Sequence, residues 1–249
     1  MMSRSAAEPE RSGDSRRQSA SHLSYNDCWQ TPIEYLSPGN GRTKNGYLWV
    51  AHNPALKTTV FHWRTGRAAS CLHEIVPEGF KGVIQCDGCS AYNAFARSPP
   101  RKGSIRLAGC WAHVRRRFFE AREYSPDARW VLSRIQKLYV IEERLRESRA
   151  GPEQRHASRQ AQSRPLVEEL HAQLLHWHRS HTHLPKSLTG MALTYAPGQW
   201  GTLGVFLEDG RVEIDNNLTE NAIRPTAVGK KNWLCVSRKE VPDVRRTAA

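Results

Sequence analysis

The sequence predicts an α/β fold in which a mixed β-sheet is flanked by helices and carries an inserted helical hairpin. Two observations support this class. Short strand-like and helix-like segments alternate over the first half of the chain, and an apolar periodicity of helical spacing dominates the region between about residues 127 and 180. A mixed order of strands and helices is typical of a sheet with helices packed against it.

The first half of the predicted sheet is an antiparallel meander. Residues 1–24 are rich in Ser, Arg, Glu and Ala and contain few apolar residues, which predicts a disordered tail. Strands are then expected over Thr31–Leu36, Tyr47–His52 and Thr58–Arg64, with the turn-rich segment SPGNGRTKNG between the first two. Three successive strands favour a meander.

Helices and strands alternate after the meander. A helix is expected over Ala68–Ile75, an apolar and therefore buried strand over Gly82–Cys86, and a short helix over Ser90–Ala96. A further strand over Ile105–Ala112 and a basic helix over His113–Glu123 follow. This order completes the first part of the predicted α/β core.

The middle of the chain is predicted to be helical. Apolar residues recur at helical spacing from about Asp127 to Ser180, with a break at Gly151 and Pro152, which predicts a helical hairpin. The next segment, ALTYAPGQWGTLGVFLEDG, keeps helical spacing but contains Pro197 and several glycines, so a helix there is expected to be weakened. The predicted divisions are a disordered tail, the first part of the core, the helical insertion, the core completion and a tail, at 1–24, 25–125, 126–205, 206–236 and 237–249.

The composition favours a polyanionic partner. Lys and Arg number 37 against 24 Asp and Glu, which gives a formal charge of +13 and favours nucleic acid over an acidic small molecule. No apolar run approaches the length of a membrane span, and the first residues lack the apolar core of a signal peptide. We therefore expect a cytoplasmic protein with no membrane partner, and cysteines that are free thiols.

Two carboxylates are candidates for metal-dependent chemistry. Asp87 follows the apolar strand run, at the carboxyl end where α/β sheets place ligand sites. Glu220 lies in a polar helix start, in the sequence IDNNLTENAIRP. Phosphodiester chemistry with two metal ions needs converging carboxylates, because hard cations prefer oxygen ligands. The alternatives are an Asp that caps a turn and a Glu that completes a capping box with Asn217.

Basic residues accompany both candidate acids. Arg115 and Arg116 follow His113 at the start of the basic helix, and Arg224, Lys230 and Lys231 follow Glu220. Such residues suit a DNA phosphate backbone, and the alternative is a solvated basic face.

A second constellation points to a different class of protein. Cys86, Cys89, Cys110 and His113 have the spacing of a zinc knuckle. A non-enzymatic, zinc-stabilised module that binds nucleic acid is therefore the competing hypothesis, although Cys86 and Cys110 belong to apolar runs rather than glycine-rich turns.

Five segments in order resemble one known family. The segments GRTKNGYLWV, FHWRTGRAASCL, GVIQCDGCSAYNAF, CWAHVRRRFFEA and FLEDGRVEIDNNLTENAIRPTAVGKKNWL are similar to the transposase domain of insertion sequence 66 elements, over about residues 30 to 234. The resemblance implies a ribonuclease-H-like fold and a triad of two Asp and one Glu that binds Mg²⁺ or Mn²⁺ for DNA cleavage and strand transfer. Asp87 matches the family's second Asp and Glu220 its Glu.

The sequence departs from the family pattern at several places. Trp29 occupies the place of the first catalytic Asp, and an indole cannot bind Mg²⁺. Asp27 lies two residues earlier on the same expected strand face, about 6 to 7 Å away. Cys89 replaces a Tyr, Pro197 interrupts a segment that the family keeps helical, and the sequence after Leu234 no longer resembles it. These departures indicate a truncated or degenerate copy.

The sequence therefore predicts a DDE-type DNA transposase of an insertion sequence that acts on element ends and target DNA. Catalysis is expected at Asp87 and Glu220, and DNA binding at His113 and the basic residues named above. Whether the catalytic set is complete, and whether the chain forms a homo-oligomer, is left open.

Overall fold

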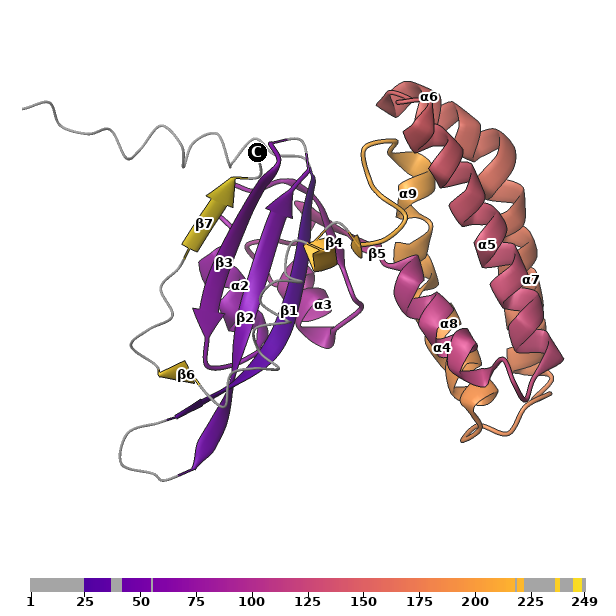
Figure 1. Cartoon of the computed structure of the whole chain (residues 1–249), viewed down its shortest axis with the longest axis horizontal. Coiled ribbons are helices and arrows are strands. Elements are labelled where there is room, and N and C mark those ends of the chain that lie inside the picture. The colour runs from indigo at the N-terminus through magenta and orange to yellow at the C-terminus, as the bar shows by residue number, and fades with distance from the viewer. Residues whose placement is uncertain are drawn as a thin grey trace, which may run out of the picture.

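The computed structural model describes residues 25–36, 42–54, 56–217, 219–221, 236–237 and 244–247 (Figure 1). These residues form a seven-stranded sheet with the order β5-β4-β1-β2-β3-β7, in which β6 pairs with β1. The strands are β1 Tyr25–Leu36, β2 Thr43–Asn53, β3 Thr58–Arg64, β4 Gly82–Cys86, β5 Ile105–Gly109, β6 Val236–Ser237 and β7 Val244–Thr247. The predicted mixed α/β class is confirmed, whereas the predicted disordered tail lies outside the described residues.

The predicted antiparallel meander is confirmed, with two longer strands. β1 pairs with β2 from Asp27 opposite His52 to Leu36 opposite Thr43, and β2 pairs with β3. β1 therefore starts earlier than expected and β2 begins inside the predicted loop. The polar start of β1 is held by tertiary pairing, because it also pairs in parallel with β4.

β5 is shorter than predicted and the following helix starts earlier. β4 and β5 are parallel, and their pairing ends at Cys86 opposite Gly109. The helix α4, Trp111–Ala121, then begins directly. Trp111 is fully buried and its indole nitrogen donates to Leu203 O at 3.0 Å. The apolar character of this segment thus reflects packing against a helix rather than a strand.

Helices cover the two faces of the sheet differently. The short helices α2, Ala69–Ile75, and α3, Ser90–Arg97, contribute Leu72 and Phe95 to a buried cluster with Trp49 and Ile84 of the sheet. A second cluster joins Val83 and Ala108 to the helices from α4 onward. Figure 1 shows these later helices as a unit beyond β5.

The predicted helical hairpin is confirmed as the body of this unit. Its elements are α5 Pro126–Glu147, α6 Pro152–Ser158, the π-helix η1 Arg159–Ser163, α7 Arg164–Arg179, α8 Leu188–Leu203 and α9 Val205–Glu208. The predicted break is present, since α6 begins at Pro152 after Gly151. α8 is a regular helix although it contains Pro197. Burial of Ala192, Ala196 and Leu203 along it offsets the weak local propensity. None of the described helices has the length and apolar character needed to cross a lipid bilayer.

Candidate active site

Asp87 lies in a tight turn directly after β4, as expected from the sequence. Its Oδ1 accepts a hydrogen bond from Cys89 N at 3.0 Å, so one carboxylate oxygen does cap the turn before α3. Gly88 has φ +81°, and a Cβ there would lie 2.8 Å from Gln199 Oε1. Tyr195 of α8 also donates from its hydroxyl to Asp87 O at 3.2 Å. The inserted helical unit therefore fixes the turn that presents Asp87.

Glu220 lies in a short helical segment that also includes Asn217. It does not occupy the position of a capping-box residue. Asn217 is already helical, and Glu220 N donates to Asn216 O at 3.0 Å. Glu220 is therefore one position beyond the one that a capping box requires. Burial raises the pKa of Glu220 and so do Asp215 and Asp87, whereas His113 and Arg116 lower it.

The charges that act on Glu220 define the site. Asp87 comes from the end of β4, His113 and Arg116 come from α4, and Asp215 precedes the Glu220 turn. The fold thus brings Asp87 close enough to influence the pKa of Glu220, although the whole helical insertion separates the two residues in sequence. Their catalytic role stays a prediction.

Asp215 is a site residue that sequence reasoning missed. It is buried, its Oδ2 accepts from the hydroxyl of Tyr139 at 2.7 Å, and its Oδ1 accepts from Asn217 N at 3.0 Å. Burial raises the pKa of Asp215, while the hydrogen bonds from Tyr139 and Asn217 lower it. The repeated Asp and Asn of IDNN is the only local signal for this residue, because Tyr139 comes from the distant α5.

Cys110 helps to anchor the same segment. Its thiol donates to Asn216 Oδ1 at 2.9 Å, and Trp111 N donates to Ile214 O at 3.1 Å. The start of α4 and the acidic segment are therefore joined side by side. Within the described part of the chain, the buried His113 Nδ1 and Thr219 Oγ1 have no hydrogen-bond partner. Such groups usually find a partner, so the site has unused capacity for a polar ligand.

The carboxylate oxygens of the described site residues are of the type that a divalent metal prefers, but they are fewer than such a site requires. Carboxylate oxygens suit Mg²⁺ or Mn²⁺, and Asp87 and Glu220 supply them. However, no three His, Cys, Asp or Glu residues converge as a metal site among the residues that the structure describes. In the parallel pairing of β1 and β4, Asp27 lies opposite Gln85. Continuing this register by two residues places position 29, which is Trp, level with Asp87.

The zinc set considered from the sequence is not formed. Cys86 is buried in the cluster with Leu72 and Phe95, whereas the Cys110 thiol donates to the acidic segment. Burial raises the pKa of Cys86 to about 12 and also raises that of Cys110. All four residues are described, and no three of them group as a metal site.

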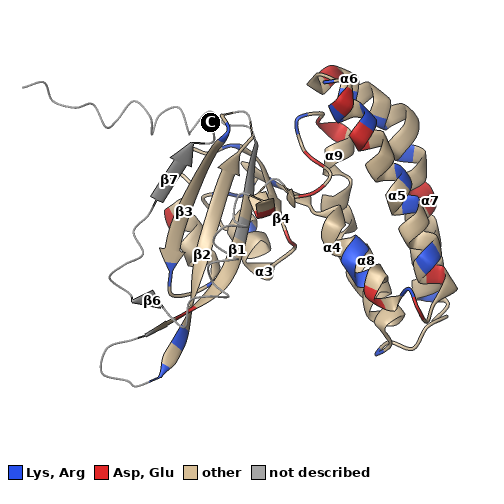
Figure 2. Cartoon of the chain, in the orientation of Figure 1, with Lys and Arg blue, Asp and Glu red and all other residues tan. Residues whose placement is uncertain are grey.

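Three of the predicted DNA-binding residues are on α4. His113 acts to lower the pKa of Glu220, which burial raises, while Arg115 and Arg116 are exposed. Figure 2 shows blue Lys and Arg segments on α4, α5 and α7. The remaining three predicted residues, Arg224, Lys230 and Lys231, lie outside the described residues.

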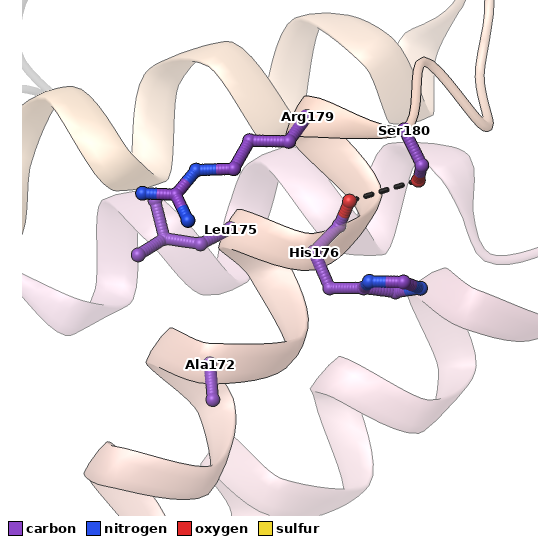
Figure 3. A pocket seen from close by; sticks show the side chains of 5 residues that line it. All are labelled: Ala172, Leu175, His176, Arg179 and Ser180. Atoms are coloured by element: carbon purple, nitrogen blue, oxygen red, sulfur yellow. Dashed lines mark hydrogen bonds between the residues drawn. The ribbon is translucent and has the colours of Figure 1, made fainter.

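A hollow on α7 is not part of this site. Figure 3 shows its lining by Ala172, Leu175, His176, Arg179 and Ser180, with the Ser180 hydroxyl donating to His176 O at 2.8 Å. All five residues belong to α7 or its end, and none is a predicted site residue.

Comparisons with known proteins agree with the sequence resemblance. The family model described as Transposase IS66 family matches residues 19–241. The uncharacterized protein y4qI of Sinorhizobium fredii (strain NBRC 101917 / NGR234) is 33% identical over 220 residues, which cover 82% of this chain and 39% of the relative. The uncharacterized protein y4jD of the same strain is 32% identical over 218 residues, which cover 83% of this chain and 42% of the relative. The chain thus spans about two fifths of the length of these relatives.

Proposed function

This chain belongs to the Transposase IS66 family, and on that premise we propose that it is a DNA-binding transposase domain whose catalytic set is incomplete at position 29. In this proposal the chain binds DNA beside Asp87 and Glu220 but does not cleave it. The observation that carries the proposal is that the other family-matched acid, Asp87, acts on the pKa of Glu220, as do His113 and Arg116 of α4.

The arrangement of the strands supports the ribonuclease-H-like fold that the family resemblance implies. Three antiparallel strands, β1 to β3, are followed by β4 and β5, which are parallel to β1, in the order β5-β4-β1-β2-β3. In this arrangement β1 and β4 are neighbours, so acids at position 29 and at Asp87 would face each other across one strand pair. The helical insertion then returns the chain so that Glu220 joins them.

The proposed defect follows from the chemistry of the residue at position 29. Transposases of the DDE class generally use divalent metal, and two-metal phosphodiester chemistry needs several carboxylates around the ions. Asp87 and Glu220 provide two, and an indole provides no oxygen ligand. Asp27 does not occupy the position level with Asp87, because it pairs with Gln85.

The proposed DNA binding does not depend on the catalytic carboxylates. Arg115 and Arg116 are exposed on α4 beside the site, where guanidinium groups can hold phosphate oxygens. Arg116 shares only a loose ion pair with Glu120, at 3.6 Å and largely exposed, which is worth little in water. A phosphate can compete for it.

Nicking of supercoiled plasmid in Mn²⁺ tests the proposal. The panel contains the native chain, Trp29→Asp, and Trp29→Asp combined with either Asp87→Ala or Glu220→Ala. Glu208→Gln in the Trp29→Asp background is the matched control, because Glu208 is exposed and pairs, among the described residues, only with the exposed Arg106, an ion pair that is worth little in water. We expect nicking only with Trp29→Asp and its control. Nicking by the native chain that Asp87→Ala abolishes would contradict the proposed defect, and a restored variant that neither binds nor nicks DNA would contradict the proposed function.

A further inference from the structure

A groove lined by arginine and an exposed aromatic ring lies between α4 and α5. It has a volume of about 430 Å³, a size typical of small-ligand sites. Phe119 lines it and is 42% exposed, so part of its ring is open to a ligand. Arg115, Arg122 and Arg129 also line the groove, with Leu132 on the α5 side.

The arginines and Phe119 form one continuous surface. Arg115, Phe119 and Arg122 follow each other at spacings of four and three, so they share one stripe of α4 and its end. The guanidinium of Arg122 lies 3.6 Å from the centre of the Phe119 ring, and that of Arg115 lies 5.7 Å from it. Arg122 is fixed there because its Nη1 donates to Phe119 O at 2.8 Å and its backbone oxygen accepts from Arg129 Nη1 at 2.7 Å.

The groove carries excess positive charge that no acid in the described part of the chain neutralises. Glu123 is the acidic residue in its lining, and it pairs with Arg122 at 3.1 Å. Arg115 and Arg129 have no acidic partner among the described residues. Two guanidinium groups without an acidic partner, beside a partly exposed aromatic ring, suit a ligand that has both phosphates and aromatic bases.

The groove and the acidic site both include residues of α4. Burial raises the pKa of Tyr139, whose hydroxyl donates to Asp215, and Arg115 of the groove acts to lower it. Burial also raises the pKa of Glu220, and Arg116, the next residue of α4, acts to lower it. From Arg115 to Arg122 the helix rises by about 10 Å.

We propose that the groove between α4 and α5 binds a short stretch of single-stranded DNA, with a base stacked on Phe119 and its Arg122 and with phosphates held by Arg115 and Arg129. This inference rests on the proposed function, because it specifies which form of DNA the basic side of that site accepts. Unpaired nucleotides are required since a base inside a duplex is stacked on its neighbours and cannot reach the ring.

Fluorescence anisotropy with the full chain tests the proposal. The probes are a labelled thymidine oligonucleotide of about a dozen nucleotides, an abasic oligonucleotide of the same length, and a duplex of the same length. Phe119→Ala removes the ring and Phe119→Trp keeps a stacking surface. Tyr124→Ala is the matched control, because Tyr124 is an 85% exposed aromatic residue close in sequence that does not line the groove.

We expect Phe119→Ala to weaken binding of the thymidine oligonucleotide roughly tenfold and to leave the abasic oligonucleotide and the duplex unchanged. Phe119→Trp and Tyr124→Ala should bind all three probes as the native chain does. Equal binding of the thymidine oligonucleotide by Phe119→Ala and Tyr124→Ala would overturn the inference while leaving the proposed function intact. An equal loss on all three probes would also overturn it, and a native chain that binds none of them would overturn the proposed function as well.

Discussion

Replacing Arg159 with Met should destabilise the protein strongly. Arg159 is fully buried, and its Nε and Nη2 donate to Glu142 Oε1 and Oε2, both at 2.8 Å. Its Nη1 donates to the backbone oxygens of Phe206 at 2.7 Å and Val212 at 2.9 Å. Arg159 therefore joins the helical insertion to the chain segment that leads into the acidic site.

The expected loss follows from what the substitution leaves behind. Removing one partner of a buried ion pair costs about 3 to 5 kcal/mol, because the remaining charge stays buried. Arg155 also contacts Glu142, at 3.2 Å, so we expect a value near the lower limit, about 3 kcal/mol. Although burial acts to raise the pKa of Glu142, Arg159 and Arg155 lower it, which agrees with a charged carboxylate that needs these partners.

Urea denaturation of Arg159→Met, Glu142→Leu and the double variant at neutral pH measures this effect. The double variant should lose less stability than the sum of the two single variants, since it leaves no unpaired charge. A loss below about 1 kcal/mol for Arg159→Met, which is the scale of an ordinary hydrogen bond, would refute the reasoning. Strict additivity in the double variant would refute it as well.

Two further predictions concern the acidic site itself. Gly88→Ala should lower the free energy of unfolding by more than about 1 kcal/mol, because Gly88 has φ +81° and an added Cβ would meet Gln199; thermal unfolding beside the native chain measures this. Glu220→Gln should stabilise the protein at neutral pH. Its folded-state pKa is raised, so the native carboxyl favours folding only while it is protonated, below its unfolded pKa, and that contribution is lost as the pH rises through the folded pKa. Melting temperatures measured at pH values below and above this range should agree at the acidic end and favour Glu220→Gln at the neutral end, and the reverse order would contradict the assignment.

The sequence was sufficient for strands and helices whose limits are set locally. β3 and β4 have the predicted bounds, because turn residues and glycine flank short apolar or β-branched runs. The start of β1 was missed because Asn26 and Asp27 are polar and are held in the strand by pairing with β4, and Asp27 also by pairing with β2. Trp111 was assigned to a strand because a short apolar run does not distinguish a buried strand from a buried helix start.

One part of the acidic site was predictable because it also follows from a local sequence signal. The position of Asp87 follows from the end of an apolar strand, which is a local signal. The roles of Tyr139 and Tyr195 as hydrogen-bond donors to the site depend on how α5 and α8 pack, and no spacing in the sequence specifies that packing. The groove at Phe119 was missed because it needs α5 beside α4.

We propose that this transposase domain keeps the acidic site but lacks its first carboxylate. The rate of Mn²⁺-dependent plasmid nicking by Trp29→Asp beside the native chain tests this proposal. We expect nicking by Trp29→Asp that disappears when Asp87 or Glu220 is also replaced, and none by the native chain. Equal nicking by both, with the same dependence on Asp87, would contradict it.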